Sequence, residues 1–209
     1  MMDIQSYFYR GIAVILALGV HEMAHALVSY LMGDPTAKEK GRLTLDPLAH
    51  IDVAGLICML IFGIGWAKPV PIDPRYYKDR KTGIVWNSFA GPMANFLLSF
   101  ICVVLFYGTY RFLYSMGIAG RVIQTILSYT ATISASLGIF NLIPIPPMDG
   151  SKVLFAFLPD DIYYKAIQEN KIWTIILFAL ILSGLIGGPI SLLTSNLIDI
   201  FSNICINIL

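Results

Sequence analysis

Two histidines and a glutamate occur within five residues of the sequence, in the order His21-Glu22-Met23-Ala24-His25. On an α-helix, positions i and i+4 lie on one face, so both imidazoles can bind the same metal ion. Glu22 is rotated by one residue from His21 and can reach a metal-bound water without being a ligand. The neighbouring residues are mostly apolar, and ionisable side chains in such a segment are functional by default. The spacing therefore predicts a zinc site beside a general base, against the alternative of an accidental pattern.

Two imidazoles leave this site incomplete, because a catalytic zinc ion binds three protein ligands and keeps one position open. Asp149 is the leading candidate for the third ligand: it follows three prolines that end an apolar segment, and Gly150 then permits a sharp turn. Irregular backbone at membrane depth is tolerated only where it is buried in protein or lines a cavity. Two alternatives stay open: Asp149 could cap a helix that begins near Ser151, or His50 could supply the third ligand instead.

A glycine and an asparagine lie four residues apart in the next apolar stretch, in Gly91-Pro92-Met93-Ala94-Asn95. Gly91 allows another helix to approach closely, and Asn95 follows one turn later. A side-chain amide in lipid needs a partner, and the spacing leaves two roles equally open for Asn95: a donor to the oxyanion of a tetrahedral intermediate, or a bond to a neighbouring helix. Asn141 has the same two alternatives, of which the structural one is favoured.

The segments that carry these residues are apolar enough to cross a membrane. Hydrophobic residues make up 57% of the 209 residues and charged residues 13%, about half of the roughly 25% charge of a soluble domain. This composition excludes an ordinary water-soluble enzyme. A helical span needs about 20 mostly apolar residues, and four stretches qualify: residues 11–32, 84–110, 122–143 and 172–193. We predict an all-α polytopic membrane protein, a bundle of four to six transmembrane helices.

Two further segments are ambiguous. Residues 53–67 are apolar, but as a helix they would extend only about 22 Å, so a re-entrant or interfacial element suits them better than a span. Residues 191–209 are long enough to cross but amphipathic, and could lie in the interface. Residues 41–45 and 66–72 have β-favouring or proline-extended sequences. We therefore expect a small β/re-entrant element at the cytosolic surface between the first two spans.

The distribution of positive charge predicts the orientation. If residues 53–67 do not cross, eleven of the fourteen Lys and Arg residues lie on one side, in the long loop 33–83 and after Pro147. Positively charged loops stay in the cytosol, so the site is expected towards the cytosolic side of the cell membrane. The net charge of +1 provides no field that would attract nucleic acid. The expected partners are the lipid bilayer and membrane proteins, and a homo-oligomer is left open.

Three motifs occur in order on successive hydrophobic segments: His21-Glu22-xx-His25, Gly91-xxx-Asn95 and Asn141-xx-Pro144 with Asp149-Gly150. In this combination, over residues 11–152, the chain resembles the site-2 protease family of intramembrane zinc metalloproteases. Residues 41–52 and 65–71 resemble its short bacterial and archaeal branch without PDZ or CBS domains. The chain departs from the family pattern at three positions: Met148 replaces a usual leucine, Asp46 an asparagine and Val53 a proline.

The resemblance implies one membrane-embedded metalloprotease domain over residues 1–209, with a catalytic core at about 11–152 and C-terminal helices over 153–209. It implies one Zn²⁺ per chain, held by His21, His25 and Asp149. Glu22 would be the general base for a zinc-activated water, and Asn95 would assist the transition state. The expected substrates are membrane proteins cleaved in or near their transmembrane segments, with an extended substrate strand pairing along residues 42–45. The alternatives are a metal-ion transporter and a non-proteolytic metal-binding membrane protein.

Overall fold

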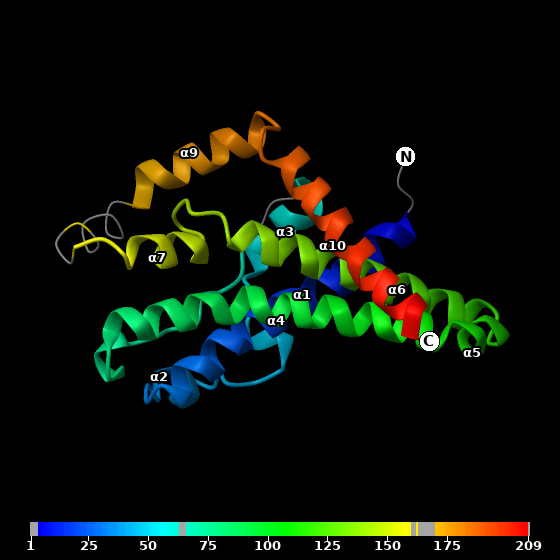
Figure 1. Ribbon diagram of the computed structural model, residues 1–209, viewed down its shortest axis with the longest axis horizontal. Helices are drawn as coiled ribbons and strands as arrows, with labels where there is room; N and C mark the ends of the chain where they lie inside the picture. The colour runs from blue at the N-terminus through cyan, green and yellow to red at the C-terminus, as the bar shows by residue number, and fades with distance from the viewer. Residues whose placement is uncertain (1–3, 63–65, 160–161, 163–169, 209) are drawn as a thin grey trace.

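The computed structural model describes residues 4–62, 66–159, 162 and 170–208. Four of its helices are long and apolar enough to cross a membrane: α1 (Ile4–Leu31), α4 (Arg80–Gly108), α6 (Ile118–Asn141) and α10 (Gly187–Ile208). Figure 1 shows α4 and α6 side by side, with α10 crossing over them. The prediction of an all-α polytopic bundle is confirmed, and the first three predicted spans coincide with α1, α4 and α6.

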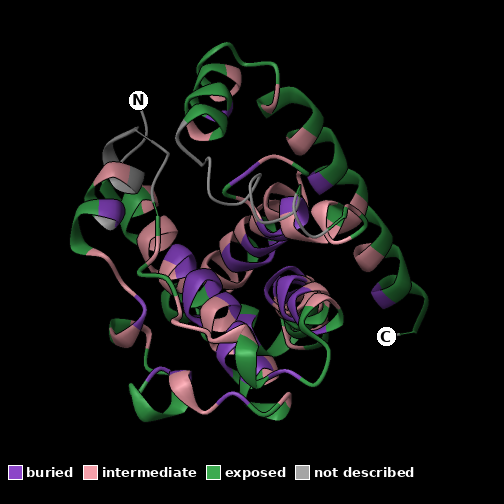
Figure 2. Cartoon of the chain, turned by 90° about the vertical axis from the view of Figure 1, so that its left-hand side faces the viewer, coloured by how far each residue is buried: buried purple, intermediate pink, exposed green. Residues whose placement is uncertain are grey.

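The core of the bundle lies where α1, α4 and α6 face one another, and Figure 2 shows the buried residues, in purple, gathered on the inner sides of the packed helices. The buried face of α1 consists largely of small side chains, including Ala13, Ala17 and Ala24. Without a hydrophobic driving force between helices in lipid, small residues let the backbones approach and gain packing contacts. Large apolar side chains instead remain exposed on the outside of the helices, where acyl chains would cover them. This close packing brings the polar residues of the three helices together.

Shorter elements connect these helices. Between α1 and α4 lie α2 (Thr36–Glu39), η1 (Pro47–Ala49), α3 (Val53–Phe62) and η2 (Pro74–Tyr76). The helix α5 (Tyr110–Ser115) joins α4 to α6, and α7 (Asp149–Phe155) and α9 (Asn170–Leu182) lie between α6 and α10. Residues 63–65 of the ambiguous segment lie outside the described residues, and the ten described residues of α3 extend about 15 Å, too short to cross a membrane. This length agrees with the expectation that the segment 53–67 does not cross.

The predicted fourth span, residues 172–193, is wrong. Its first half forms α9, which has 13 residues and extends about 20 Å, short of the hydrocarbon thickness of about 30 Å. The chain then turns at Gly184, whose φ of 76° favours glycine, and α10 starts at Gly187. Pro189 is accommodated in the first turn of α10, where a missing N–H is tolerated. The fourth span-length helix is therefore α10, which contains most of the segment left ambiguous by the sequence.

The predicted β-strands are also absent from the described residues. Residues 41–45 form turns and bends, and residues 66–72 pair with the rest of the loop through an isolated bridge between Ile51 and Ala67. The buried Arg42 side chain donates to the carbonyl of Lys68 and so fixes the loop without a ladder. Prolines 69 and 71 lack the N–H groups that a longer ladder needs. The expected pairing edge along residues 42–45 therefore does not exist.

Candidate metal centre

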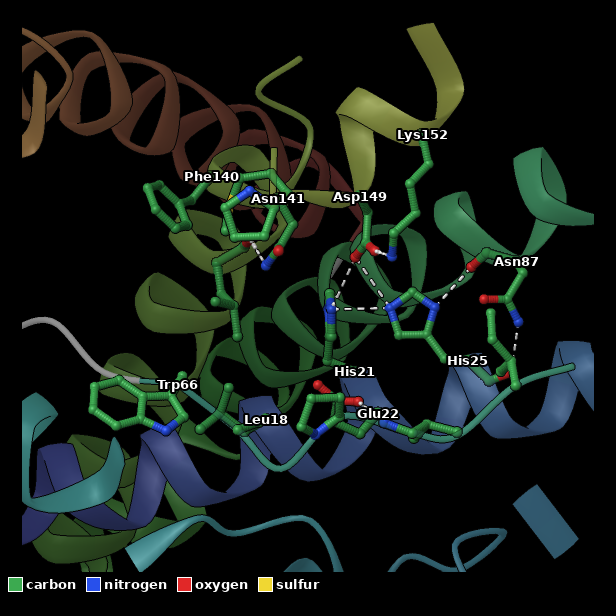
Figure 3. A pocket seen from close by; sticks show the side chains of 17 residues that line it. Leu18, His21, Glu22, His25, Trp66, Asn87, Phe140, Asn141, Asp149 and Lys152 are labelled. Carbon is green, nitrogen blue, oxygen red and sulfur yellow. Dashed lines mark hydrogen bonds and ion pairs between the residues drawn. The ribbon is translucent and has the colours of Figure 1, made fainter. Parts of the chain in front are cut away.

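The structure brings His21, His25 and Asp149 together in the interior of the bundle. The two histidines lie one turn apart on α1, and all three side chains are buried. Asp149 Oδ2 lies 3.2 Å from His21 Nε2 and 3.1 Å from His25 Nε2, and the two Nε2 atoms are 3.1 Å apart. Figure 3 shows these three atoms converging on one point. Among the described residues, this is the one group of three or more His, Cys, Asp or Glu side chains arranged to hold a metal ion.

The position of Asp149 follows from the way the chain leaves α6. The prolines after Asn141 end that helix, and α7 then begins at Asp149. A Cβ atom at position 150 would overlap the carbonyl oxygen of Leu142, so only glycine lets α7 fold back against the end of α6. The Asp149 side chain makes no capping hydrogen bond to α7. Its oxygens instead contact the two histidines and Lys152, so the capping alternative is excluded.

The two carboxylate oxygens of Asp149 have different neighbours. Oδ2 faces the imidazoles, whereas Oδ1 accepts a hydrogen bond of 2.9 Å from Lys152 Nζ, one turn later on α7. Lys152 thus orients the carboxylate and leaves a single oxygen at the centre. The sequence analysis did not identify this role, although the spacing of three residues within one helix was a signal for such an ion pair.

The helix α4 supplies the partners on the other side of the imidazoles. His25 Nδ1 lies 2.8 Å from the backbone carbonyl of Asn87, and Asn87 Nδ2 donates in turn to the carbonyl of His25 at 2.9 Å. The amide nitrogen of Asn95 lies 3.1 Å from His21 Nδ1. A Cβ atom at Gly91 would overlap both imidazoles, so α4 can pass this close only with glycine there. The close approach predicted for Gly91 is thus an approach to the two histidines.

Because a carbonyl oxygen only accepts, the Asn87 contact requires that His25 Nδ1 carries a proton. The lone pair of a neutral His25 then lies on Nε2, which points at Asp149. Metal-binding histidines are oriented in this way, with the second ring nitrogen donating to a fixed acceptor. Sequence reasoning missed Asn87 because the contact uses its backbone carbonyl, which any residue type provides.

A cavity of about 270 Å³ opens beside these residues. Glu22 lines it together with the three candidate ligands, and Glu22 Oε2 accepts a hydrogen bond of 3.3 Å from the backbone N–H of Val70. Asn141 also lines the cavity, and its amide donates to the carbonyl of Leu137 in its own helix. Further lining residues come from the segment 66–72 and from the end of α6, among them Pro69, Val70 and Ile72. Figure 3 shows Trp66 and Phe140 on this side of the cavity.

The rival third ligand, His50, lies outside this cluster. It is fully buried in the loop before α3, and its Nε2 donates to the carbonyl of Thr44 at 2.9 Å. The centre therefore consists of two imidazole nitrogens and one carboxylate oxygen, a ligand set found in zinc peptidases, with the cavity beside it for water and substrate. These donors fit a catalytic zinc ion by type, number and convergence.

Comparisons with known proteins agree with this chemistry. Residues 115–184 match Peptidase family M50. "Putative zinc metalloprotease YwhC" of Bacillus subtilis is 35% identical over 178 residues, which cover 85% of this chain and 81% of that protein. "Putative zinc metalloprotease Rip2" of Mycolicibacterium smegmatis is 28% identical over 174 residues, which cover 80% of this chain and 64% of that protein. No solved structure matches.

A third relative, MJ0611 of Methanocaldococcus jannaschii, carries the same description and is 31% identical over 138 residues, which cover 64% of this chain and 62% of that protein. The two bacterial relatives and the archaeal one are thus all described as putative zinc metalloproteases. The match to YwhC is long enough, and similar enough, to establish the family. Together with a ligand set suited to zinc and four membrane-length helices, it identifies the chain as a multi-pass zinc metalloprotease belonging to Peptidase family M50.

Proposed function

We propose that this protein hydrolyses peptide bonds in or near the transmembrane segments of other membrane proteins, with His21, His25 and Asp149 holding one Zn²⁺ and Glu22 acting as the general base. The observation that carries the proposal is the convergence of two Nε2 atoms and one carboxylate oxygen in a cavity between membrane-length helices. In this proposal the whole chain, residues 1–209, is one membrane-embedded domain.

The depth of the site supports action within the membrane. His25 lies six residues before the end of α1, or about 9 Å at 1.5 Å per residue. That end of α1, the start of α4 and the end of α6 adjoin the segments richest in Lys and Arg, and this charge distribution supports an opening of the cavity on the cytosolic side. Water needs to travel only a short distance from the cytosol to reach the site.

The chemistry divides between the metal and the side chains. Bound zinc supplies a Lewis acid that polarises the scissile carbonyl and acidifies water. Glu22 takes a proton from the attacking water as its oxygen bonds to the carbonyl carbon, and delivers that proton to the leaving nitrogen as the C–N bond breaks. The Val70 N–H, 3.3 Å from Glu22 Oε2, orients the carboxylate for both transfers.

The size of the cavity limits the form of the substrate. An α-helix with its side chains is about 10–12 Å in diameter, and a cavity of about 270 Å³ cannot hold several turns of one. We therefore expect a substrate helix to unwind locally, which also exposes its shielded peptide bonds to attack. The segment 66–72 contributes to one wall of the cavity, and we expect the unwound peptide to lie opposite it.

The test uses purified protein in liposomes with a panel of single-pass membrane proteins as substrates. For Glu22→Gln we expect a loss of cleavage of about 10²–10⁴-fold, the usual contribution of a general base. Zinc content should be unchanged, because Glu22 is not one of the three converging ligands. Uncleaved substrate should also co-purify with this variant. Full cleavage by Glu22→Gln, or cleavage restricted to soluble peptides, would contradict the proposal.

A further inference from the structure

Asn95 is buried beside His21 in an arrangement that leaves one polar atom without a partner. Its side chain is fully buried in α4, and its Nδ2 lies 3.1 Å from His21 Nδ1. Its Oδ1 is buried too and has no hydrogen-bond partner among the described residues. Asn95 does not belong to the lining of the cavity, and it meets the His21 ring at Nδ1, whereas Asp149 meets that ring at Nε2.

The chemistry of imidazole decides which atom of Asn95 should face His21. A neutral imidazole has one N–H and one lone pair, so a histidine that binds metal through Nε2 carries its proton on Nδ1. That proton needs an acceptor. His25 has one in the carbonyl of Asn87, but an amide nitrogen cannot accept. Half a turn of the Asn95 amide exchanges its two atoms and gives the Nδ1–H of His21 an acceptor in Oδ1.

The same half turn places the amide NH₂ of Asn95 in the position that Oδ1 leaves, where it needs an acceptor of its own. Ser99 lies one turn further along α4, and helical side chains lean towards the preceding turn. Its hydroxyl is fully buried and has no partner among the described residues, as is also true of Ser134 on α6. Buried hydroxyls of this kind can accept from the amide directly or through a water molecule.

We propose that Asn95 is a positioning residue: in the metal-loaded protein its carbonyl oxygen accepts a hydrogen bond from His21 Nδ1–H and thereby holds the Nε2 lone pair towards Asp149. The inference rests on the metal-binding role of His21 in the proposed function. It assigns Asn95 an acceptor role behind the imidazole, in place of the donor role at the oxyanion that the family resemblance suggested. Asn95 thus does for His21 what the Asn87 carbonyl does for His25.

The two possible roles of Asn95 predict different activities for Asn95→Asp, which keeps an acceptor but removes the donor. An acceptor role predicts that cleavage is retained, whereas a donor role at the oxyanion predicts that cleavage is lost. If Asn95 accepts from His21, Asn95→Asp should bind zinc within about 3-fold of wild type, whereas Asn95→Leu should bind about 10–100-fold more weakly, as when an outer-shell partner is lost. Zinc affinity is measured in detergent by competition with a chelator. The control is Thr130→Val, which removes another buried, unpartnered hydroxyl from the bundle and should leave the affinity unchanged.

A spectroscopic measurement on the wild type requires no variant to fold. The chain has three histidines, so the ¹⁵N spectrum of histidine-labelled protein contains few signals. In the zinc-loaded protein His21 and His25 should both carry protons on Nδ1, and the His21 proton should exchange slowly with water. His50 is the internal reference, since its Nε2 donates to Thr44 and its tautomer is the opposite one.

Each outcome bears on one proposal. Equal zinc affinities for wild type and Asn95→Leu, or a zinc-loaded His21 with no proton on Nδ1, would overturn the role of Asn95. Normal zinc binding in Asn95→Asp combined with lost cleavage would restore the donor role at the oxyanion. If the wild-type protein binds zinc but His21 is not one of the ligands, this result would instead contradict the proposed function itself.

Discussion

Two buried carboxylates, Asp34 and Asp149, differ in the kind of atom that surrounds them. Asp34 is fully buried just after α1 and accepts hydrogen bonds from the Ser29 hydroxyl at 2.8 Å and from the backbone N–H groups of Thr36 and Asp73 at 2.9 and 2.7 Å. All three partners are donors. They fasten the end of α1 to α2 and to the segment that leads into α4, so this carboxylate is structural.

Asp149 faces groups that can themselves act as ligands. A neutral His25 donates its one ring N–H, on Nδ1, to the Asn87 carbonyl. Its Nε2 atom therefore carries the lone pair and lies 3.1 Å from Asp149 Oδ2. Two acceptors at this distance are stable only with a cation between them, either a proton or a metal ion. The two buried carboxylates thus differ in their partners: Asp34 faces donors alone, whereas one oxygen of Asp149, the candidate ligand, faces two imidazole nitrogens.

The largest effect is expected from the removal of Asp149, which tests whether this carboxylate binds the metal. We expect Asp149→Ala to lower zinc affinity by more than about 100-fold, beyond the loss seen when only an outer-shell partner is removed, and to abolish proteolysis. The helices should remain, because Asp149 contributes no cap to α7. Zinc content and circular dichroism of the purified variant check both parts. Retained zinc at wild-type affinity would show that Asp149 is not a ligand.

Removal of Asp34 should produce the opposite pattern. Asp34→Ala leaves the backbone N–H groups of Thr36 and Asp73 without their acceptor, and unsatisfied groups of this kind cost about 1–3 kcal/mol in stability. We expect a loss of about 2 kcal/mol, measured by thermal unfolding in detergent, with zinc affinity of the folded protein unchanged. A loss of zinc at full stability would mean that the two carboxylates are not functionally distinct.

Much of the metal centre could be predicted from the sequence because its key spacings are local. The histidines of α1 follow helical periodicity, and the prolines and Gly150 mark where α7 must turn back. The partners behind the ligands could not be predicted in this way. Which residues of α4 face the imidazoles depends on how two helices pack, and the carbonyl of Asn87 carries no signature of residue type.

The errors in the fold have related causes. The fourth span was misplaced because average hydropathy does not register where a continuous apolar stretch breaks, and the break at Gly184 is a backbone turn between two apolar helices. The strand expected at residues 41–45 does not form. The free energy that favours a strand locally is small, and the hydrogen bond from the buried Arg42 side chain to the Lys68 carbonyl holds the loop in another conformation. The second outcome depended on an interaction outside the local sequence.

Lys152 provides a milder test, because it contacts the proposed metal ligand Asp149 without being one of the three candidate ligands. Lys152→Met removes the hydrogen bond to Asp149 Oδ1 while keeping the length of the side chain, so the carboxylate loses its orientation. We expect zinc affinity to fall about 10-fold, at the low end for loss of an outer-shell partner. Lys152→Arg should restore most of it. Chelator competition measures both variants, and equal affinities for all three proteins would remove Lys152 from the centre.

The smallest expected effect is the pH dependence that Asp34 confers on stability. Burial alone would raise the pKa of this carboxyl, but the hydrogen bonds from Thr36, Asp73 and Ser29 outweigh burial and hold the pKa below its ordinary value of 3.8. A lowered pKa in the folded state means that the unfolded chain binds the proton first as the pH falls. The stabilisation by Asp34 is therefore fully present above about pH 4 to 5 and is lost as the pH falls through the lower folded pKa.

Asp34→Asn separates this contribution from that of the other carboxyl groups, since the amide cannot titrate in this range. Thermal unfolding of wild type and Asp34→Asn between pH 6 and 3 should give curves whose difference is constant at the upper end and narrows on acidification. Asp73 also titrates low, because its bonds to Arg75 lower its pKa to about 2, but it is present in both proteins and cancels in the difference. A difference that widened towards low pH would mean that the Asp34 pKa is raised in the folded state, and that its donors do not compensate its burial.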